Sequence, residues 1–554
     1  MFKWKALFVC FALEALGRKL YDVDLPEEHM ACFLRNNPNA KKQCEQDENC
    51  RFKHLKNITC CWGHEHGCKP EHRYHSATCP GDSEGWAINK AAQIQKFFQQ
   101  GDFGYISERR RKLSILCRPE KSGDSLLECT PNTELCRAKD IRMDFVRLLK
   151  LPPPVKYRED ILGPGLIGGR CRLDAGALKA EGQHKSPLQS WYAELEHFTE
   201  LSATDVNDCD IVIKKPVVIM KLDATVNIYH HFCDFVNLYL SLHFNNTFSK
   251  NFNVLIWDIY PYRSSVAPMW KSFTDHEPLT LGPYVGKKVC FREALFSFLP
   301  RMIFGLYYNM PLVPGCSGSG IFHAFNRHVL HRLRIKVERP KHVRITFLSR
   351  SSKHRLVLNE DELIAQARKL QGASVRRVSF THATDFIEQI TITANTDILI
   401  GMHGAGLTHV LFQPDWGVLF ELYNCEDEAC YRDLARLRGV RYVTWESKEK
   451  LTPQDEMLRR HKILHLTLIL CWLCAWVASR MHLLEPQACG EDLDALIASQ
   501  TSPRSAWSIF AHPFQFAITQ KEKEKGHCDI SSLFLNVGPA SDLRCPCKVY
   551  KLRV

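Results

Sequence analysis

Three kinds of sequence signal are missing from this chain. It has no basic run interleaved with aromatic residues, which argues against a nucleic acid as partner. The glycine turn at residues 403–406 has neither the spacing of the dinucleotide fingerprint nor that of the P-loop, so it is not one of the commonest nucleotide-binding motifs. The chain's apolar stretch at residues 463–479 lacks Asp, Glu, Lys and Arg, but it is shorter than the ~20 residues that a membrane helix usually needs. A membrane contact is therefore expected only if that short segment inserts.

What is present is the composition of a globular protein. The 554 residues are 45% hydrophobic and 24% charged, and a chain of this length is expected to form roughly two to four domains with ample core. The formal net charge of +12 suits an anionic substrate such as a nucleotide sugar. A mildly basic, solvated surface is the alternative interpretation, and we favour it because no basic run is interleaved with aromatic residues.

Cysteine is abundant: the chain has 24, and ten of them lie between Cys32 and Cys136. This density is typical of proteins that fold in an oxidising compartment and form disulfides. Residues 1–17 combine two lysines, an apolar core and small residues, which predicts a signal peptide, with a short amphipathic helix as the alternative. Sequons at Asn57 and Asn245 add two candidate glycosylation sites. Together these features predict entry into the secretory pathway.

Zinc binding is the alternative interpretation of the cysteine-rich segment. Its residues with metal-binding side chains are Cys60, Cys61, His64, His66, Cys68, His72 and Cys79. Their spacing contains no paired Cys-x-x-Cys framework. In a secreted chain we therefore favour disulfides, whose pairing cannot be read from the sequence.

The chain divides by composition and periodicity. A cysteine-rich region at 18–150 precedes a first α/β lobe at 151–330, which begins with the stiff proline-rich connector 151–155. A second α/β lobe spans 331–455, and a divergent tail spans 456–554.

Strands and helices alternate from about residue 210 onward. The expected strands are residues 210–213, 216–220, 253–257, 343–348, 374–378, 398–400, 417–423 and 440–444, and the expected helices are residues 360–370, 384–393 and 429–437. Such alternation predicts an α/β fold with parallel sheets covered on both faces. Ligands in such sheets sit at the carboxyl ends of the strands.

The most informative motif is the turn His403-Gly404-Ala405-Gly406, which we call the phosphate turn. A short buried strand precedes it, and residues 407–412 read as the first turns of a helix. A glycine turn between a strand and a helix aims backbone N–H groups at an anion such as a phosphate. The alternative is a purely structural turn.

Several segments resemble glycosyltransferase family 61, in particular its members that modify EGF-like repeats. The resemblance runs from about residue 20 to about residue 455 and rests on residues 25–29, 186–191, 220–239, 401–409, 421–428 and 431–445. It implies two Rossmann-like lobes in a GT-B-like arrangement, with the acceptor on the first lobe and the donor on the second. It also implies an inverting transfer of N-acetylglucosamine (GlcNAc) from UDP-GlcNAc to Ser or Thr of folded EGF-like repeats. The acceptor proteins would be Notch-like receptors and extracellular matrix proteins, met in the lumen of the endoplasmic reticulum.

Donor-binding candidates follow from the chemistry of such a transfer. The leaving diphosphate needs stabilisation where charge develops, and the amides of residues 404–407 together with His403 could supply it. Arg350 follows a predicted strand and could clamp a phosphate bidentately, with a solvated loop arginine as the alternative. Glu421 ends a strand and could accept from ribose hydroxyls, or it could be a surface carboxylate.

Base candidates lie in the first lobe, because an acceptor hydroxyl must lose its proton. His230, His231 and Asp234 are the candidates. On a helix His230 and Asp234 share one face at i and i+4, so the carboxylate could orient the imidazole. The alternative is a structural histidine pair.

Two departures from the family pattern stand out. The family's short acidic motif for optimal activity reads here Asp275-His276-Glu277, whose two carboxylates could contact Mn²⁺, Mg²⁺ or the donor, or could form a plain acidic turn. Similarity also stops at about residue 455, and the chain ends without the family's retrieval signal. Secretion, or anchoring through residues 463–479, is therefore expected as an alternative to lumenal retention. A catalytically impaired, EGF-binding lumenal protein is the alternative function.

Overall fold

The computed structural model describes residues 19–55, 57–81, 86–308, 313–351, 356–422, 429–444 and 451–453, together with residues 474, 477 and 550–552. The predicted signal peptide at 1–17 and most of the tail at 456–554 lie outside these residues. Within them, no helix combines the length and the apolar character that a membrane crossing requires.

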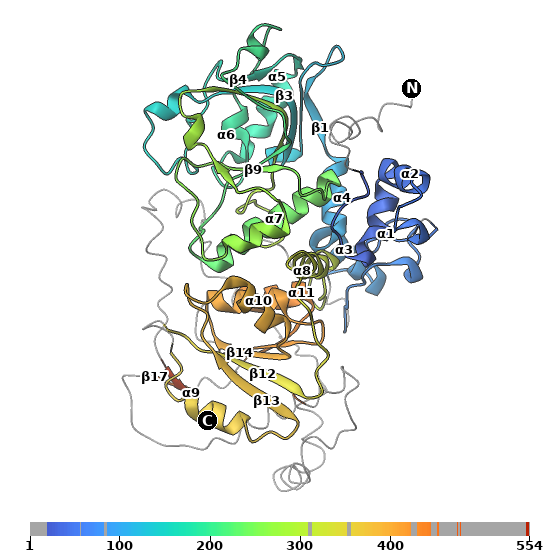
Figure 1. Ribbon diagram of the computed structural model, residues 1–554, viewed down its shortest axis with the longest axis vertical. Helices are drawn as coiled ribbons and strands as arrows, with labels where there is room; N and C mark the ends of the chain where they lie inside the picture. Colours follow the sequence, from blue (N-terminus) through green and yellow to red (C-terminus); the bar gives the residue numbers. More distant parts are fainter. Residues whose placement is uncertain are drawn as a thin grey trace.

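Four helices and a set of disulfides build much of the cysteine-rich region. Helices α1 (Glu27–Asn36), α2 (Pro38–Gln46), α3 (Lys90–Gly101) and α4 (Phe103–Arg111) form the blue part of Figure 1. The disulfides of the described chain are Cys32–Cys60, Cys44–Cys50, Cys61–Cys68, Cys79–Cys316, Cys117–Cys171, Cys129–Cys136 and Cys209–Cys290. The predicted disulfide-bearing region is therefore confirmed.

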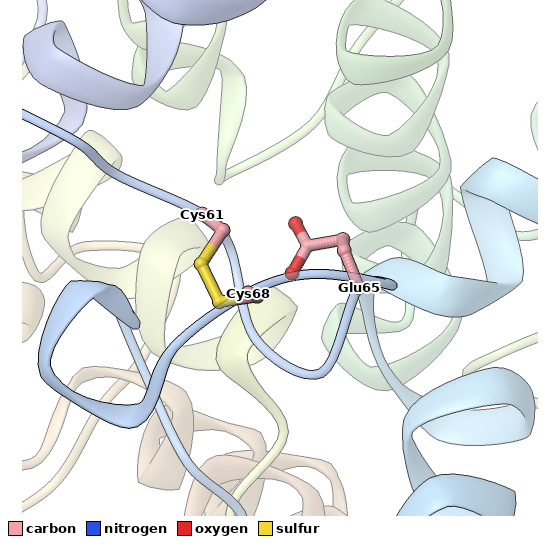
Figure 2. Close-up of side chains that lie close together, drawn as sticks. All are labelled: Cys61, Glu65 and Cys68. Carbon is pink, nitrogen blue, oxygen red and sulfur yellow. A yellow bond between two sulfur atoms is a disulfide. The ribbon is translucent and has the colours of Figure 1, made fainter.

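These bonds occupy the cysteines that the zinc interpretation requires. Figure 2 shows Cys61 bonded to Cys68 beside Glu65. The carboxylate of Glu65 accepts the backbone N–H groups of Trp62 and Gly63, each at 2.7 Å. Because every cysteine of the zinc alternative is disulfide-bonded, none offers a thiolate to a metal.

The first lobe is built on an eleven-stranded mixed sheet. Its strands are β1 (Ser114–Arg118), β2 (Leu126–Cys129), β3 (Cys136–Asp144), β4 (Ile167–Gly169), β5 (Arg172–Leu173), β6 (Phe198–Glu200), β7 (Ile211–Ile213), β8 (Val217–Met220), β9 (Asn253–Ile256), β10 (Leu279–Thr280) and β11 (Lys288–Phe296). The main order is β10-β9-β8-β11-β3-β2-β1-β5. Strands β8 to β11 run parallel as expected, whereas β3 is antiparallel to β11 and to β2. Only a few residues separate β2 from β3, and so short a connection allows antiparallel pairing alone. The cysteine-rich region thus adds its strands to the sheet of the first lobe.

The second lobe carries a five-stranded, wholly parallel sheet. Its strands are β12 (Val343–Leu348), β13 (Ala373–Val378), β14 (Ile398–Met402), β15 (Val418–Leu422) and β16 (Arg441–Thr444), in the order β13-β12-β14-β15-β16. The helices are α9 (Glu360–Ala367), α10 (Phe386–Ala394), the 3-10 helix η10 (Ala405–Phe412) and α11 (Cys430–Arg438). This order is doubly wound, and its topological switch point lies between β12 and β14. The α/β prediction is confirmed, although the helix expected at 407–412 is a 3-10 helix that begins at Ala405.

Two long helices are shared by the lobes. Helices α7 (Ile228–Asn245) and α8 (Gly320–Arg332) lie between the two sheets in Figure 1. Phe232 of α7 packs on Phe386 and Phe412 of the second lobe, at ring-centroid distances of 6.1 and 5.4 Å. Asn326 of α8 donates to the carbonyl of Leu411 at 2.8 Å. One hydrophobic core therefore continues from the first lobe into the second.

A few residues of the tail belong to the described structure. Strand β17 (Leu451–Pro453) pairs antiparallel with β18 (Tyr550–Leu552). Cys474 and Val477 are buried in the hydrophobic cluster that includes Ile345 and Phe420 of the second sheet. The rest of the apolar segment expected at 463–479 lies outside the described residues.

Three buried histidines lie where α1, α7 and α8 meet. His29, His243 and His328 come from these helices and are almost fully buried. Burial disfavours the imidazolium, so the pKa of His243 falls to about 3. Burial also holds the pKa of His29 and that of His328 well below the usual value. These side chains are neutral in the folded protein under mildly acidic conditions.

We expect acid to destabilise the protein through these histidines. Their pKa values in the folded state lie below the ~6.5 of an unfolded histidine. The stabilisation of the folded state by these neutral histidines is therefore complete above about pH 6.5, and it is lost as the pH falls and protonation favours the unfolded state. At pH 5 the protonation linked to His243 should lower the free energy of unfolding by about 2 kcal/mol relative to pH 7, and His29 and His328 act in the same direction. Urea unfolding of the wild type and of His243→Gln at both pH values measures the effect.

The matched control is His54→Gln, because the His54 side chain is 56% exposed. An equal pH dependence in the wild type and in His243→Gln would contradict this expectation.

Candidate active site

The phosphate turn lies at the carboxyl end of β14, as expected. All five residues of β14 are buried, and the chain turns at Gly404, whose φ of +152° is rarely adopted by other residues. Among the described residues, no protein acceptor binds the amides of Ala405 and Gly406. The amide of Leu407, which we had expected to face the ligand, instead donates to the carbonyl of Gly404 at 2.9 Å. The turn therefore presents the first amides of η10 to an anion.

Arg350 reaches the same turn from the neighbouring strand. It follows β12 directly, and β12 and β14 flank the switch point of the sheet. Its Nη1 donates to the carbonyl of His403 at 3.0 Å. A Cβ at position 404 would lie 2.0 Å from that nitrogen. Glycine at this position is therefore what lets the guanidinium lie against the turn, where it can bind a phosphate.

Glu421 is a partner of His403. The His403 Nδ1 lies 2.6 Å from Oε1 of Glu421, and the hydroxyl of Tyr442 donates to Oε2 at 2.6 Å. The Glu421 side chain is only 1% exposed, and both of its oxygens are hydrogen-bonded to protein side chains. This geometry does not support the expected contact of Glu421 with a ribose. Burial and the Glu421 carboxylate raise the pKa of Tyr442, which therefore stays a proton donor. This arrangement places the proton of His403 on Nδ1.

His409 fixes the far side of the turn. Its Nδ1 lies 2.8 Å from the carbonyl oxygen of Gly406, and its Nε2 lies 3.1 Å from Gln389. Burial lowers the pKa of His409 to about 4, so the ring is neutral and can donate to Gly406. No local pattern predicts the contact with Gln389, because that residue belongs to α10, which is a separate element.

The expected pairing of His230 with Asp234 is wrong. The His230 Nδ1 lies 2.8 Å from Oδ2 of Asp223, a residue in the loop before α7. Asp234 instead meets His231, three positions away, at 3.0 Å. The Nε2 of His231 is bound by the hydroxyl of Tyr262 at 2.7 Å, and the ring is fully buried. His231 and Asp234 are therefore structural, whereas the side chain of His230 is 24% exposed.

Asp223 is held by groups that the sequence did not single out. Arg301 donates through Nε to Oδ2 of Asp223 at 2.9 Å. Lys156 and Tyr157 donate to its main-chain carbonyl at 2.5 and 3.2 Å. Burial would raise the pKa of Asp223, but the hydrogen bond with His230 and the charge of Arg301 bring it below its usual value. Asp223 is therefore a carboxylate at neutral pH. The proline-rich segment expected to be a connector runs along this edge and delivers Lys156 and Tyr157.

The side chain of Tyr431 lies near both the phosphate turn and the surroundings of His230. The ring of Tyr431, from α11, lies 5.1 Å from the ring of His403 and 5.6 Å from that of Tyr229. Tyr229 is the neighbour of His230 in α7, and the two rings lie 5.9 Å apart. Tyr431 is therefore close both to the phosphate turn and to the part of α7 that carries His230.

The acidic motif lies elsewhere. Asp275 forms an ion pair with Lys250 at 2.7 Å, and His276 lies 3.1 Å from Asn251. These residues come just before β9 and β10, at the amino edge of the parallel strands. Asp223 follows β8 at the carboxyl edge. The structure therefore does not bring Asp275, His276 and Glu277 to the site.

The two sequons differ in accessibility. Asn57 is exposed on the surface of the cysteine-rich region. Asn245 is half-buried at the end of α7, where its Nδ2 donates to Thr247 at 3.1 Å and its Oδ1 accepts from Arg137 at 3.3 Å. Asn57 is therefore the more accessible acceptor for a glycan.

Comparison with known proteins identifies a family and several relatives that are similar to this chain. The family Glycosyltransferase 61 matches residues 228–419, which contain His230, Arg350 and the phosphate turn. Similar relatives include the EGF domain-specific O-linked N-acetylglucosamine transferase of Mus musculus, 48% identical over 80% of this chain and 86% of the relative. The proteins of the same name from Gallus gallus and Drosophila melanogaster are 48% and 47% identical, each over 78% of this chain and 84% of the relative.

Proposed function

Because the chain belongs to the EGF domain-specific O-linked N-acetylglucosamine transferases of glycosyltransferase family 61, we propose that it transfers GlcNAc from UDP-GlcNAc. The proposed acceptor is a Ser or Thr hydroxyl of a folded EGF-like repeat, as in Notch-like receptors and extracellular matrix proteins. The observation that carries this proposal is that Tyr431 contacts both His403 of the anion-binding turn and Tyr229, the neighbour of His230 in the His–Asp pair. The abundance of disulfides supports action in the lumen of the endoplasmic reticulum.

The donor diphosphate is proposed to bind at the carboxyl ends of β12 and β14. The amides of Ala405 and Gly406, the guanidinium of Arg350 and the ring of His403 converge there. Groups fixed in this way meet the charge that develops on the leaving diphosphate without reorganisation. Since Asp275 and Glu277 lie at the opposite edge of the other sheet, we propose that they act away from the reacting atoms, whether or not Mn²⁺ or Mg²⁺ accompanies the donor.

The proposed base is His230. With the proton on Nδ1 facing Asp223, Nε2 keeps a lone pair, and it has no protein partner among the described residues. In an inverting step the acceptor oxygen bonds to the anomeric carbon while the bond from that carbon to the diphosphate breaks. The electron pair of that bond leaves with UDP. The acceptor proton passes to Nε2, and Asp223 stabilises the imidazolium that forms.

A transfer assay tests the proposal directly. We expect this chain to convert UDP-GlcNAc and a folded EGF-like repeat into UDP and a repeat that gains one GlcNAc, measured by intact mass spectrometry. A reduced and alkylated repeat is the matched acceptor control and should react far more slowly. A chain that binds the folded repeat but produces neither UDP nor a modified repeat would instead establish the alternative, an EGF-binding protein without turnover. Comparison with a chain ending at residue 455 shows what the tail contributes.

A further inference from the structure

Three side chains meet at one nitrogen of His230. The Oδ2 of Asp223 lies 2.8 Å from Nδ1, the hydroxyl of Tyr308 lies 2.6 Å from it, and Nη2 of Arg301 lies 3.2 Å from it. A neutral imidazole carries one proton, on either Nδ1 or Nε2. The hydrogen-bonding partners of Nδ1 therefore determine which tautomer His230 adopts. Arg301 and Tyr308 both follow β11, far in sequence from α7.

The same three groups also hold one another. The rings of His230 and Tyr308 are stacked, with centroids 5.7 Å apart and planes 28° apart. The guanidinium of Arg301 lies 4.6 Å from the centre of the Tyr308 ring, and its Nη2 lies 2.8 Å from Oδ2 of Asp223. The stack fixes the orientation of the imidazole, and the ion pair fixes the carboxylate that it faces.

A His–Asp pair alone would have a defect as a base. A carboxylate beside Nδ1 stabilises the imidazolium, and an imidazolium cannot accept the proton of the acceptor hydroxyl. The guanidinium of Arg301 opposes this, because it neutralises Asp223 and stands beside the same ring nitrogen. Lys156, bound to the main-chain carbonyl of Asp223, adds positive charge on the same side. The further neighbours Tyr229 and Cys233 are uncharged at neutral pH.

We propose that Arg301 and Tyr308 are positioning residues for His230: the charge of Arg301 keeps the imidazole uncharged and the stacked Tyr308 ring fixes its orientation, while Asp223 holds the proton on Nδ1 and leaves the Nε2 lone pair open to the acceptor hydroxyl. The positive charge of Arg301 thereby disfavours the imidazolium. The inference rests on the proposed role of His230 as the base. It adds two residues that touch neither the acceptor nor the donor in that scheme and act through the imidazole.

The sign of the effect is specific. Removing the positive charge of Arg301 leaves Asp223 free to stabilise the imidazolium, so the base should be protonated at a higher pH. We expect Arg301→Gln to move the acidic limb of the kcat/KM profile upward by about one pH unit. In Arg301→Lys, which keeps the positive charge, the acidic limb should stay close to its wild-type position. Tyr308→Phe keeps the stacked ring and should lower kcat with little movement of the limb.

Two measurements keep this inference separate from the proposed function. The first is the pH profile of transfer. The second is the rate at which diethyl pyrocarbonate modifies His230 as a function of pH, followed by peptide mass spectrometry, because that reagent attacks the unprotonated imidazole and needs no turnover. The matched control is Arg292→Gln, since Arg292 of β11 pairs on the surface with Asp140 at 2.8 Å. Its profiles should equal those of the wild type.

The outcomes separate cleanly. Upward shifts in both profiles for Arg301→Gln, with normal UDP affinity, support the inference. If the wild type transfers GlcNAc but neither profile moves in Arg301→Gln, the inference is overturned and the proposed function stands. If the modification profile moves while the wild type shows no transfer, the effect of Arg301 on His230 stands and the proposed function falls. Should Arg301→Gln fail to fold, Lys156→Gln removes the other positive charge bound to Asp223; an acidic limb that moves upward in that variant supports the charge argument, and a limb that does not move overturns it.

Discussion

Asp223→Asn is expected to lower kcat by about 10³-fold or more while leaving the affinity for UDP unchanged. Asparagine keeps the size of the side chain but loses the charge that faces Nδ1 of His230 and Arg301. Its amide can donate to Nδ1, which would move the imidazole proton to Nε2 and block proton acceptance. A comparable loss of the orienting carboxylate lowers turnover by about 10⁴-fold in serine proteases. Steady-state transfer and calorimetry with UDP measure the two quantities separately.

The matched control for this prediction is Asp234→Asn. Asp234 makes the same kind of contact, at 3.0 Å, but with the buried His231. Asp234 also accepts the backbone N–H of Asp223, at 3.2 and 3.3 Å. Asp234→Asn should therefore lower stability by about 3 kcal/mol or more and lower turnover per folded molecule far less than Asp223→Asn does, because the carboxylate that faces His230 remains. If Asp223→Asn lowers kcat no more than Asp234→Asn does, the His230–Asp223 pair is not the base.

Gly404→Ala is expected to weaken UDP binding by about 10- to 100-fold, because each charged hydrogen bond lost to the ligand costs about 1.5–3 kcal/mol. The new Cβ would meet Nη1 of Arg350 at 2.0 Å, and the φ of +152° is unfavourable for alanine. Arg350 must therefore leave the turn, or the turn must change shape. Calorimetric titration of the variant with UDP measures the loss. The control is Gly123→Ala, where φ is +88° but nothing lies within 4 Å of the added Cβ.

A double-mutant cycle shows whether this loss acts through Arg350. Once Arg350 is alanine, Gly404→Ala has no guanidinium to displace. The two changes should then be strongly non-additive, with most of the loss already present in Arg350→Ala. Full additivity, or UDP affinity that remains normal in a folded Gly404→Ala variant, would show that this turn is not the diphosphate site.

The sequence predicted the second lobe better than the first. Strands β12 to β16 were expected close to their observed positions, because each is a short apolar run bounded by turn residues and the signal is local. In the first lobe, the pattern predicted β7, β8 and β9, but neither the parallel strands β10 and β11 nor the antiparallel continuation into β3, β2 and β1. Pairing between strands far apart in the chain depends on register and packing, which periodicity along one strand does not encode.

The sequence patterns also did not identify which side chains contact one another in the candidate site. Helical spacing offered Asp234 as the partner of His230, because i and i+4 share a helix face. The carboxylate that His230 meets is Asp223, outside the helix, and nothing in the spacing distinguishes the two. Arg301, Tyr308 and Tyr431 had no local signal at all, since each reaches the site from a separate element.

By itself, the sequence of this protein determined the features that short stretches of chain can specify. These are the disulfide-rich character, the alternation of strands and helices, and a glycine turn at the end of β14 that leaves backbone amides for an anion. The tertiary structure alone decided the partners. It placed β12 beside β14 so that Arg350 covers the turn, and it brought Tyr431 between His403 and Tyr229. It also closed Asp223, Arg301 and Tyr308 around one nitrogen of His230. The physical reason is that hydrogen bonds and charge pairs act over a few ångströms in space, and only the packed core brings residues so distant in the chain within that reach.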